Sequence, residues 1–113
     1  MAKSYQEIMN GLNAYLPKVH QGSPEAMKGF SQLAKSATAE GVLDGKTKEL
    51  IALSIAISTR CDGCIGFHVK TLIKLGVTKQ ELDEVCAMAV YMGGGPSLMY
   101  AADALRAFDE LSK

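Results

Sequence analysis

The chain of 113 residues lacks several features that would place it in a special functional class. Its 12 basic and 12 acidic side chains leave no excess positive charge to offset nucleic-acid phosphates. It has no tryptophan, and its longest apolar run, residues 50–57, is too short to cross a bilayer. The first residues contain no apolar core of a signal peptide. We therefore expect a cytoplasmic protein that binds neither nucleic acid nor membranes.

Cysteine and proline are scarce, with three residues of each. Cysteines in a chain without an export signal indicate a reducing compartment, where closely spaced thiols are more often catalytic or metal-binding than structural. A chain of this length can bury a hydrophobic core without disulfides or a structural metal. Residues 1–113 are accordingly expected to form one domain.

Apolar residues recur at helical spacing along the whole chain, which predicts about six helices. The first helix is expected to end near Pro17, because proline removes a backbone donor inside a helix. Ser23 followed by Pro24 is a helix start signal, so a second helix is expected to begin there. Its apolar face includes Phe30 and Leu33.

The later helices are marked by start and stop signals. Asp44 can cap a third helix, whose residues 50–57 are apolar on every side and are expected to be buried. Residues 78–81 form a capping box for a fifth helix, and residues 93–96 separate it from a sixth. A strand at 50–57 would fit a thioredoxin-like motif, but no other segment has strand character. The sequence therefore predicts an all-α fold.

Reactive side chains gather in one stretch, CDGCIGFH, which we interpret as the start of the fourth helix. At helical spacing, Cys61, Cys64 and His68 lie within roughly 60° of one another. Leu72 and Leu75 follow on the same face. We therefore expect the reactive groups to point toward the core.

The spacing of these residues suits thiol chemistry. Helix positions three apart place their Cα atoms about 5 Å from each other, within the range of a disulfide. His68 lies one turn after Cys64 and could exchange a proton with it. The positive end of the helix and the neighbouring Arg60 favour a thiolate. Gly63 and Gly66 weaken the helix, and we interpret them as leaving room for a substrate or partner sulfur.

Zinc binding is the competing interpretation, because Cys61, Cys64 and His68 are three plausible ligands. A closed structural site needs a fourth ligand, and only Cys86 and His20 remain as candidates. Cys86 lies on an apolar helix face and is more simply explained as a small buried side chain. His20 is expected in a solvated loop. A non-catalytic zinc-binding or assembly module therefore stays open.

Glu49 is the candidate base for these thiols. It shares a helix face with Leu53 and Ala56, so its carboxylate is expected to point toward apolar neighbours, where it would suit a general base. A first-turn glutamate that complements the helix dipole is the alternative interpretation.

Eleven residues separate Glu49 from Cys61, and this spacing followed by CxxCxxxH ending at His68 is a specific pattern. It resembles the carboxymuconolactone decarboxylase-like superfamily, in particular its alkylhydroperoxidase (AhpD-like) branch. The similarity extends over about residues 25–108. The resemblance implies an all-α fold of helical hairpins that assembles into homotrimers or homohexamers.

The resemblance also implies a dithiol peroxidase or disulfide reductase that needs no cofactor. Cys61 and Cys64 would cycle between dithiol and disulfide, with Glu49 and His68 relaying the thiol proton. The substrate would be a peroxide or a protein disulfide, and a thiol reductant or redox partner protein would supply electrons. The best-studied members place a second histidine where this chain has Gly63. Lactone chemistry, as in the founding decarboxylase branch, is an alternative activity.

The order of attack by the two sulfurs stays open at this level. The proximity of His68 favours Cys64 as the attacking thiol, whereas the helix N-terminus favours Cys61.

Overall fold

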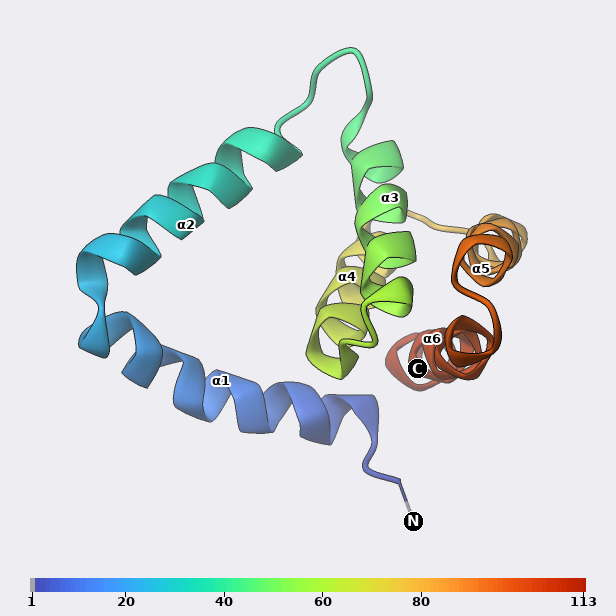
Figure 1. Ribbon diagram of the computed structural model, residues 1–113, viewed down its shortest axis with the longest axis horizontal. Helices are drawn as coiled ribbons and strands as arrows, with labels where there is room; N and C mark the ends of the chain where they lie inside the picture. The colour runs from blue at the N-terminus through green and yellow to red at the C-terminus, as the bar shows by residue number, and fades with distance from the viewer. Residues whose placement is uncertain (1) are drawn as a thin grey trace.

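The computed structural model describes residues 2–113, which form six helices and no strand (Figure 1). The predicted all-α fold is therefore confirmed. None of the helices in these residues is long and apolar enough to span a membrane. The helices are α1 (Tyr5–Gly22), α2 (Pro24–Thr38), α3 (Gly45–Ser58), α4 (Asp62–Lys74), α5 (Lys79–Gly93) and α6 (Gly95–Leu111).

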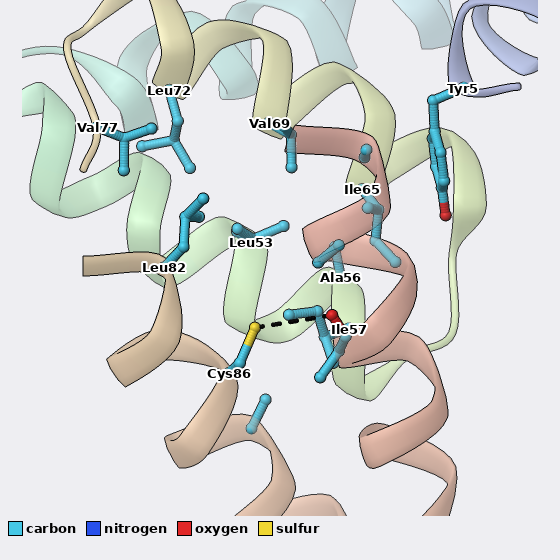
Figure 2. Close-up of a cluster of buried hydrophobic side chains, with 14 residues drawn as sticks. Tyr5, Leu53, Ala56, Ile57, Ile65, Val69, Leu72, Val77, Leu82 and Cys86 are labelled. Carbon is cyan, nitrogen blue, oxygen red and sulfur yellow. Dashed lines mark hydrogen bonds between the residues drawn. The ribbon is translucent and has the colours of Figure 1, made fainter. Parts of the chain in front are cut away.

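Helices α3 to α6 pack together and enclose the hydrophobic core (Figure 2). Complete burial of one leucine-sized side chain stabilises a fold by about 1.5–3 kcal/mol, so this core holds the two helices that carry the site in fixed positions. Its fully buried members include Leu53, Ile57, Ile65, Val69, Leu72 and Leu82.

The predicted helix starts after Asp44 and Thr78 are confirmed. The Asp44 carboxylate accepts a hydrogen bond from the Thr47 N–H at 2.7 Å. Thr78 and Glu81 form the reciprocal capping box, each accepting a bond from the backbone of the other. Glu81 also pairs with Lys46 at 2.9 Å, which ties the start of α5 to the start of α3.

The prediction that the first helix ends near Pro17 is wrong, because α1 continues through this residue to Gly22. Proline removes one N–H, whose helical partner would be the carbonyl of Asn13. Both residues are exposed. Water can therefore satisfy the freed carbonyl, and the helix tolerates the proline.

The start of α1 is fastened to α6. The Tyr5 N–H donates to Glu110 at 2.7 Å, and Arg106 donates to the Lys3 carbonyl at 3.0 Å. The Arg106 guanidinium also lies 4.6 Å from the centre of the Tyr5 ring. Tyr5 and Met9 are fully buried, so the first half of α1 belongs to the bundle.

The second half of α1 and the whole of α2, residues 13–38, extend away from the bundle, and we call them the arm (Figure 1). No residue of α2 is buried. Phe30 and Leu33 on its apolar face are 65% and 63% exposed. This apolar face therefore has no partner among residues 2–113.

The outer face of α3 is also uncovered. Leu53, Ala56 and Ile57 are buried as predicted, but Ile51 and Ile55 are 45% and 56% exposed. The prediction that residues 50–57 are buried on every side is thus wrong for the side that faces away from α4 and α6.

Candidate active site

A tight turn between α3 and α4 positions the first cysteine. Arg60 adopts a φ of 58°, in the left-handed region that side chains other than glycine seldom occupy. The Cys61 N–H then bonds to the Ala56 carbonyl at 3.1 Å. This bond returns the chain to the end of α3 and places Cys61 directly before α4.

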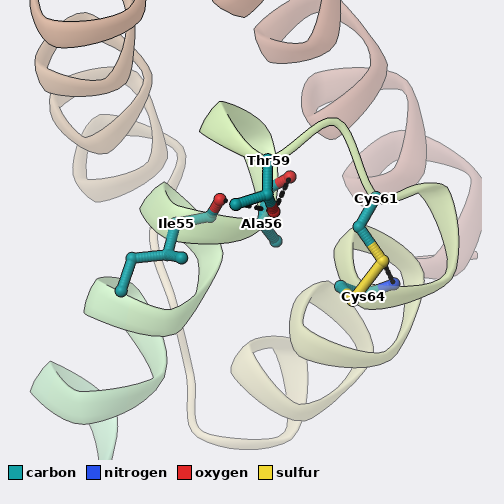
Figure 3. The surroundings of a disulfide bond; sticks show 5 residues. All are labelled: Ile55, Ala56, Thr59, Cys61 and Cys64. Carbon is teal, nitrogen blue, oxygen red and sulfur yellow. Dashed lines mark hydrogen bonds between the residues drawn. A yellow bond between two sulfur atoms is a disulfide. The ribbon is translucent and has the colours of Figure 1, made fainter.

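Cys61 is the N-cap of α4, as the predicted helix start requires. Its Sγ accepts a hydrogen bond from the Cys64 N–H at 3.2 Å. The two Cα atoms lie 5.2 Å apart, and a disulfide joins the sulfurs (Figure 3). Unpaired N–H groups and the helix dipole favour negative charge at this position. A Cys61 thiolate would therefore be stabilised by its own helix.

The expectation that the whole reactive face points toward the core is wrong. Cys64 is exposed, and the His68 side chain is 33% exposed. The buried face of α4 is instead centred on Ile65 and Leu72, while Leu75 is 45% exposed. The helix is rotated so that the second cysteine lies beside the core, where a substrate can reach it.

Glu49 and His68 come together from different helices. The Glu49 Oε2 lies 2.6 Å from the His68 Nδ1, and the glutamate side chain is only 12% exposed. A carboxylate can only accept, so Nδ1 carries the proton in this pair. In the neutral ring, Nε2 is then left free to accept a proton. The Glu49 side chain is mostly covered, and the two members of the expected relay are in contact.

The room expected beside Gly63 and Gly66 is in large part occupied by α1. A Cβ atom on Gly63 would overlap the side chain of Leu12. A Cβ on Gly66 would lie 3.1 Å from the Met9 Cγ and 3.2 Å from the Tyr5 Cδ1. At Gly63, between the two cysteines, this chain therefore packs a leucine from α1.

Sequence reasoning missed Leu12 and its neighbours at the site. Spacing within one segment cannot show which other helix packs on it. The signal in the sequence was the pair Gly63 and Gly66, because two glycines three positions apart let another helix approach closely. Beside this contact, a pocket of about 570 Å³ between α1, α4 and α6 reaches Asp62 and Gly63, and its polar lining includes Lys3, Asp103 and Arg106.

The third cysteine lies apart from the other two. Cys86 is 8% exposed, and its Sγ is 3.9 Å from the Ala101 carbonyl. Burial raises the pKa of the Cys86 thiol, and the charge of Asp83 raises it further. His20 is exposed in the last turn of α1 rather than in a loop. Within residues 2–113 no three His, Cys, Asp or Glu side chains are arranged to hold a metal ion.

An all-helical fold with a paired CxxC before a helix and a glutamate–histidine contact defines a recognisable class of protein. The carboxymuconolactone decarboxylase family model matches residues 24–107. An uncharacterized protein of Cupriavidus necator is 40% identical over 112 residues, which cover 99% of each chain. The chain therefore belongs to the carboxymuconolactone decarboxylase family, as its resemblance predicted.

Solved structures show the same relationship. A carboxymuconolactone decarboxylase family protein from Legionella pneumophila, solved in its apo form, is 56% identical with a TM-score of 0.93, covering 96% of this chain and 97% of its own. A family protein from Thermotoga maritima is 30% identical with a TM-score of 0.78, covering 96% of this chain and 90% of its own. An involvement of the Thermotoga protein in antioxidative response has been suggested.

Proposed function

We propose that this protein is a thiol-dependent oxidoreductase that reduces peroxides or protein disulfides by cycling Cys61 and Cys64 between dithiol and disulfide. The observation that carries the proposal is the pairing of these cysteines at the start of α4, one helical turn before His68, which is hydrogen-bonded to Glu49. Family membership and the suggested antioxidative role of the Thermotoga relative support it.

The different surroundings of the two sulfurs support one order of events for reduction. A thiolate of the reductant attacks the exposed Cys64 sulfur, and a mixed disulfide forms as the bond between Cys61 and Cys64 breaks. Cys61 leaves as a thiolate that accepts the Cys64 N–H bond at the helix N-terminus. A second reductant thiolate then attacks the mixed disulfide. This step releases the Cys64 thiolate and leaves the reductant as its own disulfide.

In the oxidation by a peroxide, Cys64 is the attacking sulfur, whereas in the reduction it is the sulfur attacked. The Cys64 thiolate attacks a peroxide oxygen, the O–O bond breaks, and the leaving alkoxide takes a proton to become an alcohol. The Cys61 thiolate attacks the resulting sulfenic acid, a disulfide forms, and the leaving hydroxide takes a proton to become water. His68 is the proposed proton carrier, held by Glu49 through Nδ1.

Lactone chemistry is the second candidate, favoured by the family to which the chain belongs. In that reaction Glu49 and His68 would act as acid and base without the thiols. Activity on a lactone acid that survives loss of both Cys61 and Cys64 would support it. The zinc-binding alternative has no ligand set among residues 2–113, whereas assembly is compatible with either enzyme.

The proposed redox function is tested by peroxide consumption with a dithiol reductant. Cys61→Ser and Cys64→Ser are each expected to lose turnover, because a single thiol cannot close the catalytic disulfide. Cys86→Ser is the matched control and is expected to keep it, since that thiol is buried away from the pair. Full activity in both of the first two variants would end the proposal.

We also propose that the protein assembles with itself, as a homotrimer or homohexamer. The support is the arm, whose apolar face is left uncovered by the described part of its own chain. A monomer at all protein concentrations in sedimentation velocity would contradict this proposal and would leave the redox function untouched.

A further inference from the structure

The chain exposes more surface than a compact monomer of its size. Its accessible surface is 7348 Å² for a mass of 12.0 kDa. A compact folded chain of that mass exposes roughly 6,000 Å². The excess of roughly 1,300 Å² exceeds the ~800 Å² that each partner buries in a standard stable interface. The surface available is therefore sufficient for a stable contact with another chain.

One exposed apolar surface is on α2. Phe30 and Leu33 are spaced three apart on one helix face and are both largely exposed. Lys28 and Lys35 fall on the opposite face of the helix at 100° per residue. An amphipathic helix with this distribution gains its stability by laying the apolar face against a complementary surface.

A second exposed apolar surface is a groove on the outer face of α3 and α5. Two adjoining hollows of about 260 and 290 Å³ share Ser54 and Met88. Ile51 lines the first hollow, and Ile55 and Met92 line the second. These apolar side chains are 45–75% exposed. The two hollows therefore form a row of apolar sites with Met88 between them.

We propose that the apolar face of α2 in one copy docks in the α3–α5 groove of a second copy, with Phe30 and Leu33 directed into the two hollows. This proposal rests on the proposed self-association and assigns the surfaces that produce it. Side chains three apart on a helix lie about 5–6 Å from each other, which suits two hollows that share a wall. An amphipathic helix in an apolar groove is a recurring mode of recognition.

A second copy of this chain is the occupant that fits the groove. Each chain carries both complementary surfaces, and their apolar character requires no charge from a partner. Two copies that exchange helices reciprocally would form a two-fold dimer, whereas a copy that uses its helix on one neighbour and its groove on the next makes a head-to-tail contact. Head-to-tail contacts whose rotation closes form a ring, which is compatible with a homotrimer or with a homohexamer built from two rings.

The assignment is tested by sedimentation velocity on two complementary variants. Phe30→Asp with Leu33→Asp disables the helix, and Ile55→Asp with Met88→Asp disables the groove. Each variant alone is expected to sediment as a monomer. An equal mixture is expected to form a heterodimer, because one intact helix and one intact groove remain. The dimer should need a higher protein concentration than the wild-type assembly, since a single contact lacks the closure of a ring.

The controls separate this assignment from misfolding and from the redox proposal. Lys28→Ala with Lys35→Ala changes the opposite face of α2 and is expected to leave the assembly intact. All the replaced side chains are exposed or lie on exposed faces, so circular dichroism should show unchanged helix content. Peroxide consumption, measured separately, reports on the thiols and not on the contact.

Three results would overturn the assignment. A wild-type monomer at tens of micromolar would remove self-association itself. A groove variant that stays fully assembled would show that α2 pairs with something other than the groove. A mixture that contains only monomers would show that the helix and the groove do not bind each other.

Discussion

Cys61 lies at the N-cap of α4, where its sulfur accepts a hydrogen bond from the Cys64 N–H, whereas Cys86 lies in the core between α5 and α6. Free N–H groups and the helix dipole stabilise a negative sulfur at the first place. Burial raises the pKa of the thiol at the second. The surrounding helices thus favour a thiolate at Cys61 and a protonated thiol at Cys86.

The contrast is made sharper by the neighbours of each thiol. The Cys61 pair has an exposed partner sulfur and, across α3 and α4, a glutamate–histidine contact. Cys86 has the Ala101 carbonyl at 3.9 Å and apolar side chains. An exposed sulfur and a glutamate–histidine pair are therefore present on α3 and α4, whereas Cys86 is largely buried and borders a mainly apolar hollow of about 580 Å³.

The largest expected effect separates the roles of the two paired sulfurs. With an aromatic disulfide reagent, reduced Cys61→Ser should accumulate a stable mixed disulfide on Cys64, because no second thiolate displaces the reagent. The wild-type protein should release the reagent and close its own disulfide. Intact mass measured over the reaction distinguishes these outcomes. Cys86→Ser should behave like the wild-type protein.

This order of attack would be contradicted by the opposite pattern. An adduct that persists on Cys61 in Cys64→Ser, together with no adduct in Cys61→Ser, would make Cys61 the sulfur that meets the substrate.

The second effect concerns the proposed relay. General acid–base catalysis typically contributes about 10²–10⁴-fold, so Glu49→Gln is expected to slow peroxide consumption by roughly 100-fold. Glutamine keeps the shape of the side chain but does not anchor the imidazolium form by charge. His68→Asn should cost a similar factor, and the double variant little more, because the pair acts as one unit. A Glu49→Gln variant with the wild-type rate would exclude this carboxylate from the proposed relay.

The third effect tests the packing that distinguishes the start of α4. Gly63→Ala places a Cβ against Leu12 and is expected to lower the free energy of unfolding by about 1–3 kcal/mol. Gly11→Ala is the matched control, since a Cβ there meets nothing within 4 Å. That change should be neutral or stabilising.

Urea unfolding measures both variants. Adding Leu12→Ala to Gly63→Ala should recover part of the loss by removing the overlap, and this coupling is the specific sign of direct contact. Equal stability of Gly63→Ala and Gly11→Ala would show that α1 does not pack on the turn as described.

Several features of the fold and site could be predicted because neighbouring residues encode them. Asp44 and Thr78 cap the helices that follow them through bonds to residues three positions on. Cys61 begins α4 as the helical period predicts, whereas the contact between Glu49 and His68 was expected only from the family resemblance. The caps and the start of α4 depend on local hydrogen bonding and on helical period, both of which a sequence displays directly.

Other features could not be predicted because they depend on partners that the pattern does not name. Phe30 on α2 and Ile55 on α3 are apolar, yet apolarity alone does not distinguish a core from a face left uncovered. The role of Gly63 depends on Leu12, which is far away in sequence. The prediction that the first helix ends near Pro17 failed because the effect of a helical proline depends on the solvation of the preceding turn.

The smallest effect concerns the buried thiol. Because the pKa of Cys86 is raised by burial, the unfolded chain ionises this thiol from about its ordinary value of 9.0 while the folded chain keeps it protonated. The unfolded state then binds fewer protons, so stability should fall as the pH rises above that value. Urea unfolding between neutral and alkaline pH should show a shallower decline in Cys86→Ala. An unchanged decline would mean that Cys86 takes no part in it.

The central claim is that Cys61 and Cys64 form the redox couple while Cys86 stays outside it. It is tested most directly by mass spectrometry of alkylated peptides before and after one equivalent of peroxide is added to the fully reduced protein. The account predicts that peroxide joins Cys61 to Cys64 and leaves Cys86 unmodified until the chain is unfolded. Cys61 and Cys64 that remain alkylatable after peroxide, or a disulfide that includes Cys86, would contradict it.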